Sequence, residues 1–316
     1  MLVDERAEAR SGDFRVATDD GVLLAVHDRG PQTAQRTVVF LHGLCLTRAS
    51  WAGQIDYLSR RYGSSVRLIS YDHRGHGCSG PAPMNTYRVE RLAEDLAQVL
   101  TAAQVSGQVT LVGHSMGGMT ALAYCGRGDR PVEPDGLVLV AAAAGKLTEC
   151  GLGRLLATPV TGALSGLVEH TPDHVLRAMV GPVCATLRRW RPGTQSARLA
   201  AVAVTALTST PVPTAVGFLH SLRAYDQYAA LAQIRARTVV VSGGMDPLIP
   251  PVHGRDLSVG IRGAHHVHLP EAGHMLPQQA PYVLYDAIRR AMAIEHSQDG
   301  RGKRHGPVTG RQAVPA

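Results

Sequence analysis

The stretch QVTLVGHSMGG, residues 108–118, decides the fold of this 316-residue chain. Its first five residues are typical of a strand, and residues 116–124 are typical of a helix. Between them, the pattern G-H-S-M-G places Ser115 between Gly113 and Gly117. Glycine tolerates the close backbone approach that a sharp strand-to-helix turn requires, and such a turn raises the serine hydroxyl above the sheet. We therefore interpret Ser115 as a nucleophile.

Short β-rich segments alternate with helical segments along most of the chain. The internal β-rich segments are continuously apolar, as expected for parallel strands that are covered on both faces. Apolar residues within 87–105 recur at steps of three and four, which is typical of an amphipathic helix. This alternation predicts a doubly wound, mostly parallel α/β sheet. The expected strands are 14–18, 22–28, 37–41, 66–71, 109–112, 136–140, 238–242 and 265–269.

Residues 144–230 interrupt the alternation. They contain no good central strand, and prolines punctuate their helical patches, which we place at 172–180, 195–207 and 216–225. We expect this region to be a helical cap inserted after the sixth strand. The core would then consist of residues 14–143 and 231–296. The basic tail, 297–316, is rich in glycine and proline and is expected to be a disordered, solvated terminus.

A serine nucleophile needs a general base, and the base needs a carboxylate that orients it. His274 lies on the loop that follows the last expected strand, directly after Gly273. Asp246 lies in SGGMDPLIP, directly after the strand 238–242. An aspartate before a proline also commonly forms a turn, and Asp246 can do both. The order Ser115, Asp246, His274 is that of an α/β-hydrolase triad.

A tetrahedral intermediate also needs hydrogen-bond donors for its oxyanion. The backbone N–H of Met116, the residue after the serine, is one candidate. The second is the N–H of Leu44, in the loop FLHGLCLTRASW that follows the strand 37–41. Gly43 would turn this loop toward the serine. We interpret the neighbouring His42 as structural rather than as an acid or base.

These motifs resemble those of the α/β-hydrolase fold family, in particular its lid-bearing esterases, lipases and peroxidase-like members. The resemblance extends from about residue 14 to residue 295. It implies catalysis by Ser115, Asp246 and His274, a cap that covers an acyl pocket, and a structural role for the turn after the fourth strand. The motifs that carry it are His42-Gly43-Leu44, YDHRGHGCS at 71–79, GHSMGG at 113–118, and Asp246 with Gly273-His274.

Two other arrangements were weighed against this one. Some members of the family carry the acid after the sixth strand, where this chain reads AAAAGKLTE and offers only Glu149; we therefore prefer Asp246. His265, His266 and His268 lie beside His274 in sequence, but no cysteine or carboxylate completes a tetrahedral metal set. We expect solvated or core histidines there and no metal.

Composition limits the possible partners. No apolar run is long enough for a transmembrane helix, and the charged N-terminus lacks the apolar core of a secretory signal. Five scattered cysteines indicate reduced thiols and a cytoplasmic protein. The net charge of +7 is concentrated partly in the tail, and we expect no nucleic-acid partner. No dinucleotide or phosphate-loop motif is present, so no cofactor is expected. The oligomeric state stays open.

The sequence therefore predicts a serine hydrolase that cleaves a carboxylic ester, or a related acyl bond, of a small apolar substrate. An acyltransferase, a C–C bond hydrolase or a perhydrolase would use the same three residues, and the fold does not distinguish these activities. A ligand-binding receptor with slow or no turnover is the alternative from another class.

Overall fold

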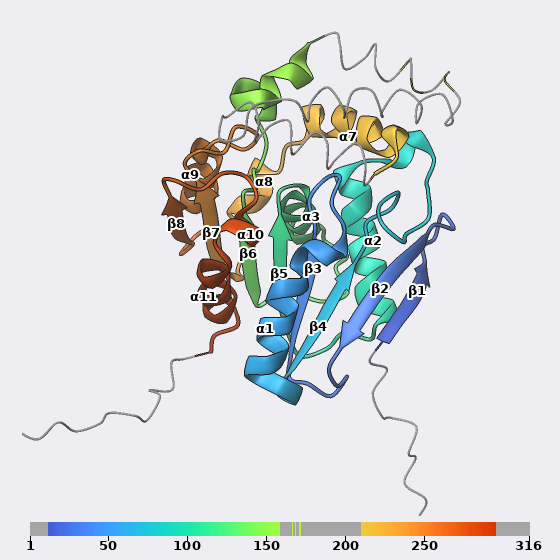
Figure 1. Cartoon of the computed structure of the whole chain (residues 1–316), viewed down its shortest axis with the longest axis vertical. Coiled ribbons are helices and arrows are strands. Elements are labelled where there is room, and N and C mark those ends of the chain that lie inside the picture. The colour runs from blue at the N-terminus through green and yellow to red at the C-terminus, as the bar shows by residue number, and fades with distance from the viewer. Residues whose placement is uncertain (1–11, 159–165, 167, 169–170, 172–209, 295–316) are drawn as a thin grey trace, which may run out of the picture.

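The computed structural model describes residues 12–158, 166, 168, 171 and 210–294. In this part of the chain, eight strands form one sheet in the order β1-β2-β4-β3-β5-β6-β7-β8. β2 pairs antiparallel with both β1 and β4, and all other neighbours are parallel. The predicted strands are all present with small shifts at their ends, and the predicted doubly wound α/β fold is confirmed (Figure 1).

The bounds of the elements are as follows. The strands are β1 Gly12–Ala17, β2 Leu23–Arg29, β3 Arg36–Leu41, β4 Val66–Tyr71, β5 Gln108–His114, β6 Gly136–Val140, β7 Arg237–Gly243 and β8 His265–Leu269. The α-helices are α1 Ala52–Tyr62, α2 Val89–Ala102, α3 Met116–Cys125, α7 Val212–Ala224, α8 Tyr228–Leu231, α9 Pro251–Gly260, α10 Leu276–Gln279 and α11 Pro281–Ala291. Short 3-10 helices lie at Arg48–Trp51, Gly63–Ser65, Met84–Thr86, Leu147–Glu149 and Gly151–Ala157.

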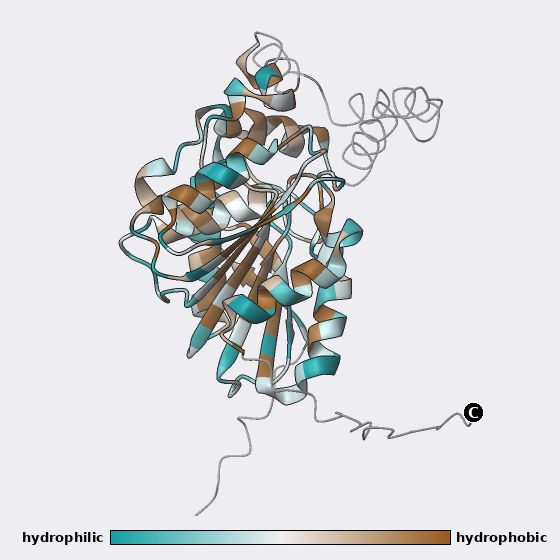
Figure 2. Ribbon diagram, turned by 90° about the vertical axis from the view of Figure 1, so that its left-hand side faces the viewer, coloured by the Kyte–Doolittle hydropathy of each residue, from teal (hydrophilic) through white to brown (hydrophobic). Residues whose placement is uncertain are grey.

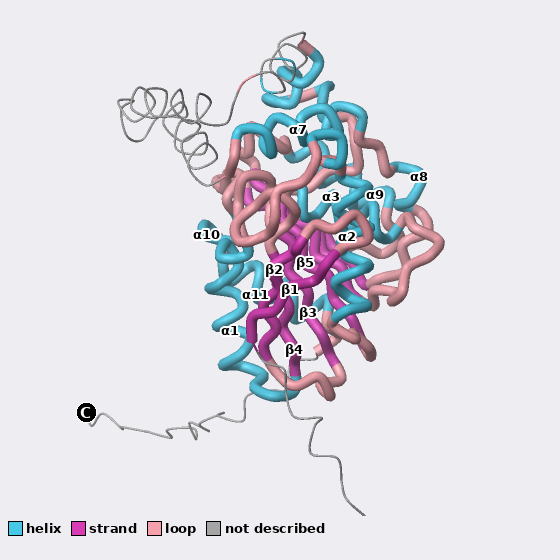
Figure 3. Tube along the Cα trace, turned by 90° about the vertical axis from the view of Figure 1, so that its right-hand side faces the viewer, coloured by secondary structure: helices cyan, strands magenta, loops and turns pink. Residues whose placement is uncertain are grey.

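Helices cover both faces of the sheet. Successive side chains of a strand point to opposite faces, so Val38 and Phe40 of β3 join one apolar cluster with α1 and α11. Val39 and Leu41 join the other cluster, with α2, α3 and α9. Figure 2 shows apolar residues concentrated along the strands, and Figure 3 shows the sheet between α1 and α11 on one side and α2, α3 and α9 on the other. None of the described helices is long and apolar enough to cross a bilayer.

The strand order reverses at β3. From β3 the chain first moves to β4 on one side, and it then returns to β5 on the other side. In open α/β sheets, ligands bind in the crevice that forms at the carboxyl ends of the strands at such a switch point. The residues after β3 begin with His42, and those after β5 begin with Ser115. The topology therefore brings the two most informative sequence motifs to one crevice.

The region between β6 and β7 is described only in part. The predicted helix 216–225 corresponds to α7, which packs on the turn after β4: a Cβ placed on Gly75 would lie 2.6 Å from Thr214 Oγ1. The predicted helices at 172–180 and 195–207 lie outside the described residues, as does the tail 297–316. The division into core and cap stays a prediction.

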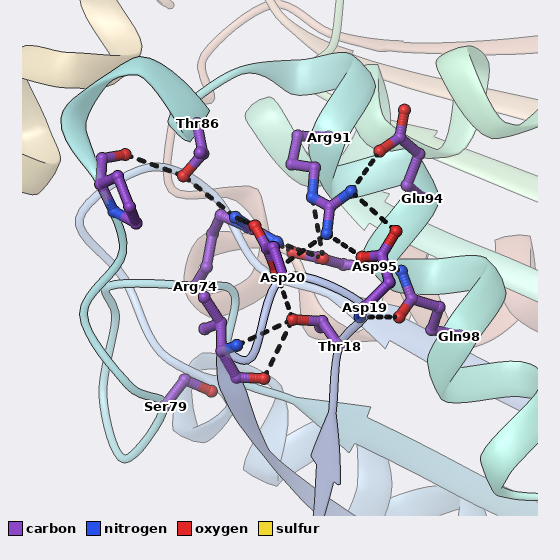
Figure 4. Close-up of polar contacts among 12 residues, drawn as sticks. Thr18, Asp19, Asp20, Arg74, Ser79, Thr86, Arg91, Glu94, Asp95 and Gln98 are labelled. Carbon is purple, nitrogen blue, oxygen red and sulfur yellow. Dashed lines mark hydrogen bonds and ion pairs between the residues drawn. The ribbon is translucent and has the colours of Figure 1, made fainter.

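The turn after β4 is held by a buried ion-pair network (Figure 4). Arg74, whose side chain is fully buried, donates two hydrogen bonds to Asp95 of α2, at 2.7 and 2.6 Å. It also donates to Asp20, in the turn between β1 and β2, at 2.8 Å. Arg91 of α2 pairs with Asp20 as well, at 2.8 Å. The network thus joins the β1–β2 hairpin, the β4 turn and α2.

Removing one partner of this network should destabilise the fold strongly. Asp95→Ala leaves the buried Arg74 guanidinium with only half of its acidic partners, and breaking a buried pair in this way costs about 3–5 kcal/mol. Urea denaturation would measure the change in the free energy of unfolding. Asp286→Ala is the matched control, because Asp286 is 43% exposed where it pairs with Arg289 and Arg290; we expect its cost to be below about 1 kcal/mol. Equal effects in both variants would contradict the assignment.

Buried histidines join the loop after β3 to the turn after β4. His42 donates from Nδ1 to the Gly43 carbonyl at 2.8 Å and accepts the backbone N–H of His73 at Nε2, at 2.9 Å. His76 accepts the backbone N–H of Cys45 at Nε2, at 3.1 Å, and donates from Nδ1 to a carbonyl of its own turn. Each ring can make both contacts only in its neutral form, in which one nitrogen carries no proton and accepts a hydrogen bond. Both ring nitrogens of His42 are thus in contact with backbone groups.

These histidines should make the protein sensitive to mild acid. Burial lowers the pKa of His42 to about 4 and that of His76 to about 3, and it holds the pKa of His73 well below its ordinary value. The unfolded chain takes up protons below pH ~6.5, whereas the folded chain does not. The free energy of unfolding should therefore fall between pH 7 and 5, by up to about 1.4 kcal/mol per pH unit for each histidine.

The measurement is urea denaturation at pH 7, 6 and 5. His76→Asn keeps a donor near the Nδ1 position and removes one titrating ring, so the slope of stability against pH should decrease by about one proton. His265→Asn, which replaces an exposed histidine, should leave the slope unchanged. A wild-type protein that is equally stable at pH 7 and pH 5 would refute this expectation.

Candidate active site

Ser115 lies in a strained turn between β5 and α3. Its backbone angles are φ 53° and ψ −120°, a conformation that costs free energy for a residue other than glycine. The Ser115 N–H donates to the carbonyl of Val140 on β6 at 2.9 Å, which holds the turn against the neighbouring strand. A Cβ on Gly113 would lie 2.5 Å from the Gly117 carbonyl oxygen, and one on Gly117 would collide with the carbonyl oxygen of Leu41. Only glycine fits at either position.

Asp246 and His274 lie together, although they follow different strands. His274 Nδ1 is 2.7 Å from Asp246 Oδ2. The other carboxylate oxygen, Oδ1, accepts the backbone N–H groups of Leu248 and Ile249, each at 2.9 Å. Asp246 therefore forms a turn and also contacts the histidine. The Asp246 side chain is fully buried and that of His274 is 9% exposed, so little water competes for their contact.

The loop after β3 closes the site on the other side of Ser115. A Cβ on Gly43 would lie 3.2 Å from the Ser115 Cβ, so the loop backbone passes directly beside the serine. The Gly43 carbonyl accepts the N–H of Leu46 at 3.1 Å, which makes a tight turn. Within the described part of the chain, the N–H groups of Leu44 and Met116 donate to no other backbone oxygen. In the described residues, neither N–H group is therefore used by the main chain.

Not every predicted partner is joined in this structure. Among the described residues, no hydrogen bond links the Ser115 hydroxyl to the His274 ring; hydrogen bonds between catalytic groups are often long before substrate binds. The alternative acid, Glu149, lies in the short 3-10 helix Leu147–Glu149. The carboxylate that contacts His274 is that of Asp246.

Two histidines of β8 contact a hydroxyl of the neighbouring strand β7. The Ser242 hydroxyl lies between the two rings, 2.8 Å from His266 Nε2 and 3.1 Å from His268 Nδ1. Across the described ranges, no group of three or more histidine, cysteine or acidic residues is placed to hold a metal ion.

One residue of the site was missed by sequence reasoning. His114, which precedes Ser115, is almost fully buried, and its Nε2 lies 2.9 Å from the carbonyl oxygen of His274. The two rings lie 4.9 Å apart between centroids. No sequence signal connects these residues, because they are 160 positions apart. Only the presence of a histidine within the G-x-S-x-G pattern could have drawn attention to it.

The comparisons with known proteins agree with this geometry. The sequence pattern of the family described as alpha/beta hydrolase fold matches residues 36–281, which include every site residue named above. The AB hydrolase superfamily protein YisY of Bacillus subtilis (strain 168) is 26% identical over 266 residues, or 82% of this chain and 91% of its own length. The 3-oxoadipate enol-lactonase 1 of Acinetobacter baylyi is 25% identical over 270 residues, or 84% of this chain and 91% of its own length.

Solved structures show the same fold. The crystal structure of a hydrolase from Pseudomonas aeruginosa PA01 matches with a TM-score of 0.67 at 24% identity, and the match covers 90% of this chain and all of that chain. The family pattern spans most of the sequence, and it includes the strands β3 to β8, the strained serine turn and the Asp246–His274 contact. The chain therefore belongs to the alpha/beta hydrolase fold family, the family of the hydrolases to which it is similar.

Proposed function

We propose that this protein is a serine hydrolase that cleaves a carboxylic ester of a small, apolar substrate. The observation that carries the proposal is the 2.7 Å contact between His274 Nδ1 and Asp246, at the same edge of the sheet as the strained turn of Ser115. A buried carboxylate that fixes one nitrogen of a histidine leaves the other nitrogen as a base. Near a serine in a strained turn, a histidine that is fixed in this way is expected to act as the general base for that serine.

Each residue then has a role in the reaction. The Ser115 hydroxyl attacks the ester carbonyl while His274 Nε2 accepts its proton, and Asp246 stabilises the resulting imidazolium. The N–H groups of Leu44 and Met116 stabilise the oxyanion, a contribution of about 3–4 kcal/mol for each donor. The alcohol leaves with the proton from His274. Water, deprotonated by His274, then attacks the acyl group on Ser115 and releases the acid.

A cap over the site is supported by the position of α7. Phe218 of α7 is fully buried against His76 and Tyr87, with ring centroids 5.8 and 5.2 Å apart. Tyr225, just after α7, donates its hydroxyl to the Met119 carbonyl of α3 at 3.0 Å. This helix thus seats an apolar segment on the elements that border the crevice. We propose that residues 144–230 form a cap over an acyl pocket.

The similarity to an enol-lactonase supports an ester bond as the target. A lactone is a cyclic ester, and its carbonyl meets the same nucleophile and oxyanion donors as an open ester.

Replacing Ser115 should abolish ester hydrolysis. We expect wild type to hydrolyse p-nitrophenyl esters, tested from acetate to laurate, and Ser115→Ala to lose activity by a factor on the order of 10³ or more. Ser258→Ala, in α9, is the control and should keep full activity. Release of p-nitrophenol gives the rates, and product analysis with a competing alcohol distinguishes hydrolysis from acyl transfer. Equal rates for wild type and Ser115→Ala on every ester would refute the proposal.

The two candidate acids can be separated in the same assay. Asp246→Ala removes the contact that orients His274, so kcat/KM should decrease by a factor on the order of 10³–10⁴. Glu149→Gln should leave kcat/KM unchanged, because a different carboxylate contacts the histidine. Thermal melting of both variants controls for folding. The reverse pattern, loss in Glu149→Gln only, would reassign the acid to the loop after β6.

A further inference from the structure

His114 connects the strand of the nucleophile to the main chain of the proposed base. It is the last residue of β5, and its Nε2 lies 2.9 Å from the carbonyl oxygen of His274. A carbonyl oxygen can only accept, so Nε2 carries the ring proton and donates it. The same carbonyl accepts the N–H of Leu276 at 2.9 Å, at the start of α10. The main chain at His274 is therefore fixed from two directions.

The His114 ring fills the space between the base and the oxyanion loop. It is 1% exposed and lies tilted against the His274 ring, with 4.9 Å between centroids. On its other side, a Cβ on Gly43 would lie 3.1 Å from His114 Nδ1. The ring therefore contacts both the loop after β3 and the loop after β8.

His114 keeps its neutral form during such chemistry. Burial, together with the smaller effect of the neighbouring His274, lowers the pKa of His114 to about 3. With its proton on Nε2, the Nδ1 atom is a bare acceptor, and it has no partner among the described residues. His114 can therefore hold the carbonyl of His274 without competing for the proton that His274 would take from Ser115.

The sheet explains why such a connection is needed. β5 and β8 are separated by β6 and β7, so His274 starts from a strand about 14 Å away from that of Ser115. The side chain of His274 has one anchor, Asp246, which itself follows β7. A side chain from β5 that holds the His274 backbone fixes the position of the base relative to β5, the strand that precedes the nucleophile.

We propose that His114 is a positioning residue that fixes the main chain of His274 and so aligns its imidazole between Ser115 and Asp246. The inference rests on the proposed function, since it assigns a role toward that nucleophile and base. It differs from a packing role because it depends on a donor at one ring atom. Packing alone would require only a side chain of similar volume.

The test compares two replacements of different chemistry. His114→Gln can place an amide N–H near the Nε2 position and donate to the same carbonyl, whereas His114→Leu fills similar space without a donor. The first readout is the rate at which a fluorophosphonate labels Ser115, which requires the serine and its base but no ester substrate. The second is kcat and KM on the best p-nitrophenyl ester as a function of pH.

We expect His114→Leu to label about 10- to 100-fold more slowly, the scale of loss from a small misplacement of a catalytic group. The loss should fall on kcat with KM unchanged. The acidic limb of the pH–rate profile should move to lower pH, because a misaligned imidazolium loses part of the stabilisation by Asp246. His114→Gln should recover most of the rate. If His114→Leu does not fold, His114→Asn, whose amide is too short to reach the carbonyl, should show the same loss.

Three results would overturn the inference. Labelling of His114→Leu at the wild-type rate would show that the donor is dispensable. Equal losses in His114→Leu and His114→Gln, with an unchanged pH profile and a lowered melting temperature in both, would show a packing role only. Absence of Ser115 labelling in wild type would show that Ser115 is not a nucleophile and would refute both proposals. Labelling without turnover of any ester would refute only the ester as substrate, because the labelling rates would still test the role of His114.

Discussion

The close approach of the turn after β5 to the loop after β3 is the constraint on which the site depends. Gly117 lies so near the Leu41 carbonyl that no side chain fits, and a Cβ on Gly43 would lie 3.2 Å from the Ser115 Cβ. These two contacts bring a serine hydroxyl and the backbone N–H groups of two loops to one point. The strain at Ser115 is tolerated because the N–H of that residue is held by Val140 of the next strand.

Stability and chemistry are separated in this arrangement. The networks of Arg74 with Asp95, and of His42 with His73, hold the surrounding turns through fully buried partners. Ser115, by contrast, has a half-buried position and no hydrogen bond from its hydroxyl to the base among the described residues. Much of the free energy that orders these turns therefore comes from residues outside the proposed set of Ser115, Asp246 and His274, although the contact of Asp246 with His274 is itself buried.

Much of this fold could be predicted, because its strands are continuous apolar runs and its serine turn has a local signature. Asp246 and His274 could be placed from their positions after strands, since the carboxyl ends of parallel strands meet at one edge of the sheet. The contact of Arg74 with Asp95 and that of His114 with His274 could not, because each depends on the pairing of distant segments. A buried histidine or arginine looks the same in sequence as an exposed one.

The contact of His114 with a main-chain oxygen also explains how such a site can tolerate change around it. A carbonyl is present whatever residue follows or precedes the base, so the alignment of His274 does not depend on the sequence of its loop. The proposed oxyanion donors, the N–H groups of Leu44 and Met116, are likewise backbone groups. On the proposed mechanism, the sheet and its backbone set the reaction geometry, and the side chains around the site set the preference among substrates.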